Sequence, residues 1–139
     1  MLQSLKLTSS GGAVDFRLAR AAVLREVARG RLSRRDVCDA HPELLRAARN
    51  VGIASGEACP LCEEGAIVHV TYAFGPRLPP GGRCPGSSSE LAKLCRSASV
   101  VACYVVEVCP DCSWNHLVRM FPAGSPTVRG SRRRGAAEA

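Results

Sequence analysis

The sequence predicts an α+β fold in which short helices precede a small antiparallel sheet. Three observations carry this prediction: apolar residues recur at three- and four-residue steps before residue 52, two stretches after residue 65 have the apolar pattern of strands, and two Cys-x-x-Cys sequences flank those stretches. With 139 residues, the chain has room for one modest domain, or for a small cysteine domain with a helical extension.

The N-terminal part is expected to be a polar, disordered segment at residues 1–12 followed by a helical segment at residues 13–57. Asp15 is the expected N-cap of the first helix. The apolar stripe of this helix is expected at Val14, Leu18, Ala21, Leu24 and Ala28. The arginines lie off that stripe and form a basic outer surface, a pattern that a merely solvated helix face also shows.

Two further short helices are expected before residue 52. Ser33 and Asp36 resemble a capping box, with Asp in place of the usual Glu. His41 is the expected N-cap of the next helix, with Pro42 in its first turn. Three short helices in succession also suggest a helix-turn-helix, but no base-reading set of Asn, Gln and Arg stands out on one helix.

Three strands are expected in residues 58–121, the part that carries the cysteine pairs. Residues 67–74 alternate in polarity, residues 100–108 are apolar on both faces except at Glu107, and residues 114–121 follow the last pair. The stretch 100–108 is therefore the expected central strand. Residues 75–89 form a proline- and glycine-rich insertion, a short helix follows it, and residues 122–139 are an expected disordered basic tail.

The two cysteine pairs are predicted to bind one zinc ion through Cys59, Cys62, Cys109 and Cys112. A Cys-x-x-Cys turn aims two sulfurs at one point, and two such turns supply the tetrahedron of thiolates that zinc prefers. Because each pair adjoins strand-like sequence, the expected architecture is a three-stranded antiparallel zinc ribbon with an inserted loop and short helix. Four thiolates leave no open position on the metal, so the zinc is expected to be structural and the protein non-enzymatic.

Other roles for the cysteines are weighed against this one. The proline in Cys-Pro-x-Cys also occurs in disulfide exchangers, so a thiol-disulfide redox protein is an alternative, although strand-like sequence follows each pair. Residues 1–27 contain no secretory signal, and no apolar run is long enough to span a membrane. The expected location is therefore the reducing cytoplasm, where such pairs bind metals more often than they form disulfides.

Three further residues are expected beside the metal without binding it. His69 lies on the first strand, and His116 lies four residues after Cys112. Trp114 is expected to pack against the second cysteine turn, although an exposed tryptophan there could also stack on a nucleotide. Cys38, Cys84, Cys95 and Cys103 receive no role in the site.

The net charge of +7 is concentrated outside the cysteine module, because residues 58–121 carry five basic and five acidic side chains. Basic flanks attract negatively charged partners, and the expected partner is RNA, a ribosome or an RNA polymerase. An adaptor that binds a protein partner is the alternative, and no small-molecule substrate is evident. The expected contact residues are Arg17, Arg20, Arg34, Arg35, Arg132, Arg133 and Arg134.

Several of these stretches together resemble a family of small, zinc-ribbon-like actinobacterial proteins of unknown function. The resemblance rests on residues 36–48, on Cys59-Pro60-x-Cys62, and on the residues from 69 to 72, 103 to 109 and 114 to 117. It covers roughly residues 14–121 and implies that the cysteine turns and the helical lead-in form one unit. It implies no activity, and the chain departs from the family in the loop at residues 79–89.

Overall fold

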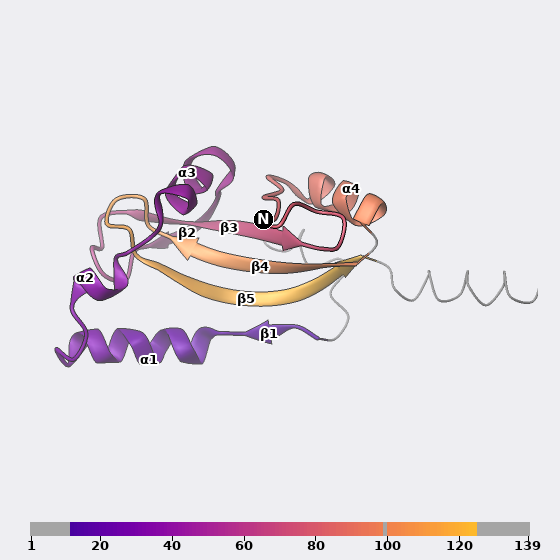
Figure 1. The fold of residues 1–139 in the computed structure, drawn as a ribbon. Helices are drawn as coiled ribbons and strands as arrows, with labels where there is room; N and C mark the ends of the chain where they lie inside the picture. The colour runs from indigo at the N-terminus through magenta and orange to yellow at the C-terminus, as the bar shows by residue number, and fades with distance from the viewer. Residues whose placement is uncertain (1–11, 99, 125–139) are drawn as a thin grey trace, which may run out of the picture.

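The computed structural model describes residues 12–98 and 100–124 and has a five-stranded antiparallel sheet at its centre (Figure 1). The strands lie in the order β1-β5-β4-β3-β2. They are β1 (Val14–Asp15), β2 (Ile53–Ala58), β3 (Ala66–Phe74), β4 (Val100–Val108) and β5 (Asn115–Gly124). The helices are α1 (Arg17–Ala28), α2 (Arg34–Val37), α3 (Pro42–Val51) and α4 (Ser88–Ala98). The prediction of mixed helix and sheet is confirmed, whereas the three-stranded ribbon is not confirmed, because the sheet has five strands.

The three predicted strands are the inner strands β3, β4 and β5, and β4 is central as expected. The two missed strands lie at the edges. Val14 and Asp15 pair with Met120 and Arg119 of β5 instead of starting a helix. Residues 53–58, most of which were expected to belong to the helical segment, pair with β3 around an irregularity that contains Gly56 at φ 84. Their sequence is poor in strand formers, so pairing with β3 rather than local propensity defines this strand.

The C-terminal limit of the sheet also differs from the prediction. Residues 122–124, assigned to a disordered tail, belong to β5 and pair with the start of β4. The remaining tail, 125–139, and the N-terminal residues 1–11 lie outside the described residues, so the expected disorder there stays a prediction.

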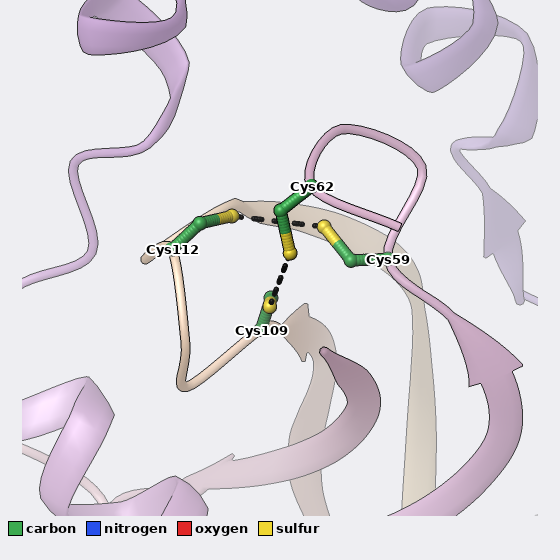
Figure 2. Close-up of side chains that lie close together, drawn as sticks. All are labelled: Cys59, Cys62, Cys109 and Cys112. Atoms are coloured by element: carbon green, nitrogen blue, oxygen red, sulfur yellow. Dashed lines mark hydrogen bonds between the residues drawn. The ribbon is translucent and has the colours of Figure 1, made fainter. Parts of the chain in front are cut away.

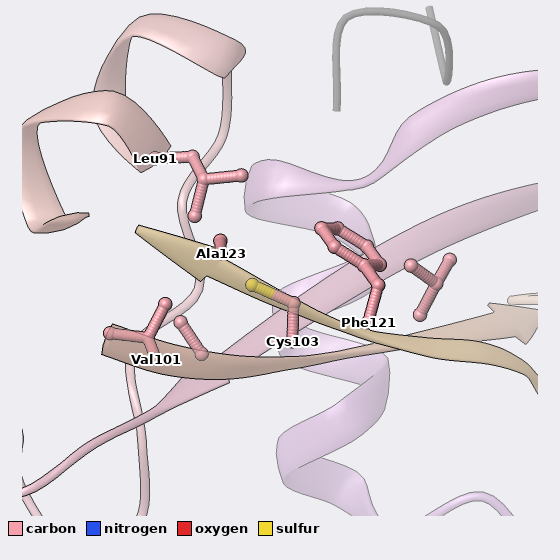
Figure 3. Packing of buried hydrophobic residues seen from close by; sticks show 7 residues of the cluster. Leu91, Val101, Cys103, Phe121 and Ala123 are labelled. Carbon is pink, nitrogen blue, oxygen red and sulfur yellow. The ribbon is translucent and has the colours of Figure 1, made fainter. Parts of the chain in front are cut away.

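The two faces of the sheet have different coverings, because successive strand residues point to opposite sides. On one face, which we call the α4 face, Leu91 of α4 packs on a fully buried cluster that includes Cys103, Phe121 and Ala123 (Figure 3). On the other, the α3 face, Ala48 of α3 packs on Val70 and Val108 near one end of the strands. Helix α4 therefore covers part of one face of the sheet, and α3 covers part of the other.

The starts of α2 and α3 match their predicted caps. The Ser33 hydroxyl accepts from the Asp36 amide at 3.2 Å, and the Asp36 carboxylate accepts from the Ser33 amide at 2.8 Å, which completes the capping box. In α3, Nδ1 of His41 accepts from the Glu43 amide at 3.0 Å, with Pro42 in the first turn. Both helices therefore begin where their local sequence satisfies free backbone amides.

Helix α1 departs from its prediction in both its start and its buried side. Its N-cap is Phe16, while the Asp15 carboxylate accepts from the Arg17 amide at 2.8 Å. Leu18, expected to face inward, is 87% exposed. The residues of α1 that pack inward are Val23, Leu24 and Val27, which join the hydrophobic cluster around the cysteines.

Candidate metal centre

Four cysteine sulfurs from two distant parts of the chain meet at one point (Figure 2). Cys59, Cys62, Cys109 and Cys112 have their sulfurs within 4.8 Å of one another. Two of these separations cross between the pairs: 3.6 Å from Cys59 to Cys112 and 3.7 Å from Cys62 to Cys109. A tetrahedral metal with metal–sulfur bonds of about 2.3 Å requires sulfurs about 3.8 Å apart. The four cysteines could therefore hold a metal ion, as their spacing predicted.

The two cysteine turns share one backbone conformation. The amide of Glu63 donates to the Cys59 carbonyl at 3.0 Å, and that of Ser113 donates to the Cys109 carbonyl at 2.8 Å. Glu63 and Ser113 both follow the second cysteine of their turn, and both have positive φ, 62° and 74°. A left-handed residue at this point reverses the chain, so that both sulfurs of a turn face the same side.

Gly65 brings the two turns together. Its carbonyl accepts from the Cys59 amide at 2.8 Å, and a Cβ at this position would clash with the Cys109 sulfur. Its amide points at the Cys62 sulfur at 3.4 Å. Backbone amides of Gly65 and Glu64 lower the pKa of Cys62 to about 7, whereas burial raises the pKa of Cys109 and Cys112. The first turn therefore favours a thiolate at Cys62.

A fifth cysteine, which the sequence analysis left without a role, lies beside the site. The thiol of Cys38 donates toward the Cys112 sulfur at 3.7 Å. Cys38 ends α2, and no spacing relates it to the two cysteine pairs. Its proximity follows from the packing of α2 against the cysteine turns and has no local sequence signal.

Glu107 is a buried acid that ties the site to α1. Its carboxylate accepts a hydrogen bond from the indole nitrogen of Trp114 at 2.6 Å. Nε of Arg20 donates to the same carboxylate and lies 2.9 Å from each of its two oxygens. The side chains of Arg20 and Glu107 are 25% and 6% exposed. Arg20 was expected to contact a partner from the surface, but in the structure its guanidinium is held in this internal ion pair.

The two candidate histidines lie near Glu107 on the sheet. His69 is its partner on β3 and His116 its partner on β5. The His116 ring stacks on Trp114 with 6.0 Å between centroids, and Trp114 itself is fully buried. Burial lowers the pKa of His69. Trp114 belongs to the hydrophobic cluster that contains Cys59 and Cys109, and Glu107 and the two histidines are linked to it or to one another on the sheet.

Of the other predicted contact residues, those that the structure describes lie on α1 and α2. Arg17 pairs with Asp15 at 2.8 Å on the surface, and Arg34 and Arg35 are exposed on α2. Residues 132–134 lie outside the described residues. Over the part of the chain that the structure covers, no helix is both long and apolar enough to cross a membrane.

Comparison with known proteins agrees with the resemblance seen in the sequence. The uncharacterized protein Rv0049 of Mycobacterium tuberculosis strain H37Rv is 40% identical over 112 residues, which cover 81% of this chain and 82% of the relative. The uncharacterized protein Mb0050 of Mycobacterium bovis has the same identity and coverage. No solved structure matches the chain. A family described as a family of unknown function (DUF5318) matches residues 7–137, and the chain belongs to this family.

Proposed function

We propose that this protein is a non-enzymatic zinc protein of the cytoplasm that binds nucleic acid, either alone or within a ribosome or RNA polymerase. The observation that carries the proposal is the basic surface that the metal centre supports. Residues 12–38, which form α1 and α2, carry seven arginines and three acids, and both helices pack on the cysteine turns.

Zinc is the proposed metal because all four ligands are thiols. Four sulfurs at tetrahedral spacing select zinc or iron, and a closed set of four protein ligands is typical of a structural site. Such a site leaves no position for a substrate or an activated water. Metal analysis of protein purified under reducing conditions without a chelator should find one zinc per chain, whereas bound iron would give visible absorbance.

The nucleic-acid part of the proposal rests on exposed arginines that we call the α1–α2 surface. These are Arg17, Arg25, Arg29, Arg31, Arg34 and Arg35. Acidic neighbours pair with three of them, Arg17 with Asp15 and both Arg29 and Arg31 with Glu26. Within the described part of the chain, Arg25 and Arg34 have no acidic partner, and Arg35 has only a Coulombic attraction to Asp36. Arginines of this kind are free to bind phosphates.

Salt dependence of RNA binding tests this proposal. If about four phosphates are contacted, affinity for single-stranded RNA should fall roughly 50-fold between about 50 and 200 mM salt. The double variant Arg34→Gln/Arg35→Gln should bind more weakly and show a shallower salt dependence. Lys93→Gln/Arg96→Gln removes the same charge from α4, on the face of the sheet opposite α3, and serves as the matched control. A flat salt response, or equal loss in both variants, would contradict the proposal.

A protein-binding adaptor is the second candidate, because Leu18 on α1 is 87% exposed and Val14 beside it is 41% exposed. In this case zinc only maintains the shape of the domain and the apolar pair contacts a partner. A partner that co-purifies after nuclease treatment, and that is lost with Leu18→Ser but retained with Arg34→Gln/Arg35→Gln, would favour the adaptor. A redox role has less support, because the two cysteine pairs converge on one point instead of forming separate dithiols.

A further inference from the structure

Half of the aromatic side chains of this chain lie together on the α3 face. The chain has three phenylalanines, two tyrosines and one tryptophan, and both tyrosines share this face with Phe74. The rings of Tyr72 and Phe74 are nearly parallel with centroids 6.4 Å apart, and Tyr104 meets Phe74 edge-on at 5.7 Å. All three side chains are half-buried rather than buried.

These rings line a groove that α3 leaves open. The groove has a volume of about 430 Å³, and Leu44 of α3 forms one wall of it. The other apolar lining residues are Tyr72, Phe74, Tyr104, Val106 and Leu117. The groove thus presents flat aromatic surfaces without a charged side chain among the residues named.

On the opposite face of the same strands, side chains of the sheet are fully buried under a helix. Ala73 and Cys103, each adjacent in sequence to a residue of the groove, are fully buried under α4. On the α3 face, helix α3 packs instead on Val70 and Val108, toward the cysteine end of the strands. The aromatic end is therefore the part of the α3 face that α3 does not seal.

We propose that this groove binds single-stranded nucleic acid by stacking bases on Tyr72, Phe74 and Tyr104. This inference rests on the proposed function and names the surface that contacts the bases. Every base has a flat π-face, so aromatic side chains on a sheet bind single strands with little sequence preference. Paired bases of a duplex cannot reach such rings without unstacking, so the groove should prefer single strands.

The distribution of charge favours nucleic acid over other occupants. Gly124 pairs with Val100, close to the Ala102–Phe74 pair, so the chain leaves the sheet at its aromatic end. Residues 125–139, which continue from there, carry four arginines and one acid. A net charge of +7 attracts a polyanion such as a single-stranded nucleic acid. A second copy of the chain, itself at +7, would be repelled.

The test measures binding of a labelled single-stranded oligouridylate by the full chain, by fluorescence anisotropy at low salt. Tyr104→Ala should weaken binding about tenfold, and Tyr104→Phe, which retains the ring, should rescue most of that loss. Leu18→Ala removes an exposed apolar side chain outside the groove and should bind like the wild type. A duplex of the same length should bind more weakly than the single strand. Thermal midpoint and metal content establish that each variant is folded.

Ultraviolet cross-linking of the wild-type complex gives a second readout that needs no variant. Cross-links are expected on the tryptic peptides that contain Tyr104 or Tyr72. If the wild type binds but Tyr104→Ala binds equally well, or cross-links fall only on α1 and α2, this inference is wrong and the proposed function stands. If no nucleic acid binds at low salt, both this inference and the proposed function are wrong. A dimer in sedimentation that Tyr104→Ala dissociates would identify a second copy as the occupant and also overturn the inference.

Discussion

At the scale of single residues, Cys38 is the position beside the four clustered cysteines whose role is easiest to isolate. Its thiol lies 3.7 Å from the Cys112 sulfur and is oriented to donate to it. A hydrogen bond to a metal-bound thiolate offsets part of its charge, and loss of such a contact commonly lowers metal affinity by 10- to 100-fold. Cys38→Ala is therefore expected to retain one metal per chain but to release it to a chelator about tenfold faster.

A chelator competition assay on purified variants measures this difference. Cys95→Ala is the matched control, because Cys95 is also a half-buried thiol but packs against the α4 cluster. Equal release from both variants would mean that Cys38 only fills space. Complete loss of metal from Cys38→Ala would instead make it a ligand.

At the scale of elements, α1 is held to the sheet by one internal ion pair. Glu107 is almost fully buried, and Arg20 is its cationic partner at 2.9 Å. Arg20→Met would leave the carboxylate buried without that partner, so the free energy of unfolding should fall by about 3 kcal/mol. Adding Glu107→Gln should recover part of the loss, since glutamine can still accept from the Trp114 indole.

Urea unfolding of the metal-loaded variants tests whether the Arg20–Glu107 ion pair holds α1 to the sheet. The control is Arg17→Met, which breaks an exposed pair whose side chains are 81% and 53% accessible. That change should cost less than about 1 kcal/mol. If Arg17→Met and Arg20→Met destabilise the protein equally, the burial of Glu107 does not govern the attachment of α1.

Elements with local signals were predictable from the sequence, and elements formed by distant contacts were not. The capping residues Ser33 and His41 and the apolar run of β4 act within a few positions, so they located α2, α3 and the central strand. Strand β1 has two residues and exists through its pairing with β5. The buried side of α1 was misplaced because a polar residue, Arg20, faces inward toward Glu107.

The residues of the candidate site also fall into those with a local sequence signal and those brought together by distant contacts. The spacing within each Cys-x-x-Cys encodes the local turn, so the four clustered cysteines were found from the sequence alone. Cys38 and Glu107 reach the site through packing of separate elements, and periodicity does not report such contacts. Glu107 did stand out as the polar exception in an apolar strand, but its partners Arg20 and Trp114 could not be read from that pattern.

At the scale of the whole molecule, the hydrophobic core is divided into three clusters, which should depend on the proposed metal to different degrees. The cysteine turns pack with α1 and α2, whereas separate clusters form under α3 and α4. Metal removal is therefore expected to loosen α1, α2 and both turns while the β3–β4 ladder persists. Hydrogen exchange before and after chelation tests this, and uniform loss of protection would show that the metal stabilises the entire fold.

The acid response of the whole molecule should depend on His69. Burial lowers the pKa of His69 in the folded protein, whereas the unfolded chain titrates near 6.5. Below about pH 6.5 the unfolded state therefore binds more protons than the folded state. The free energy of unfolding is highest above that pH and falls as the pH drops toward the folded pKa.

Protonation of metal-binding thiols lowers the free energy of unfolding in the same direction, so its total dependence on pH does not by itself identify the histidine. His69→Gln should decrease the fall in urea midpoint between pH 7 and 5, because it removes the buried group that the unfolded chain protonates more readily. If His69→Gln retains the full wild-type slope, the thiols alone account for the acid sensitivity.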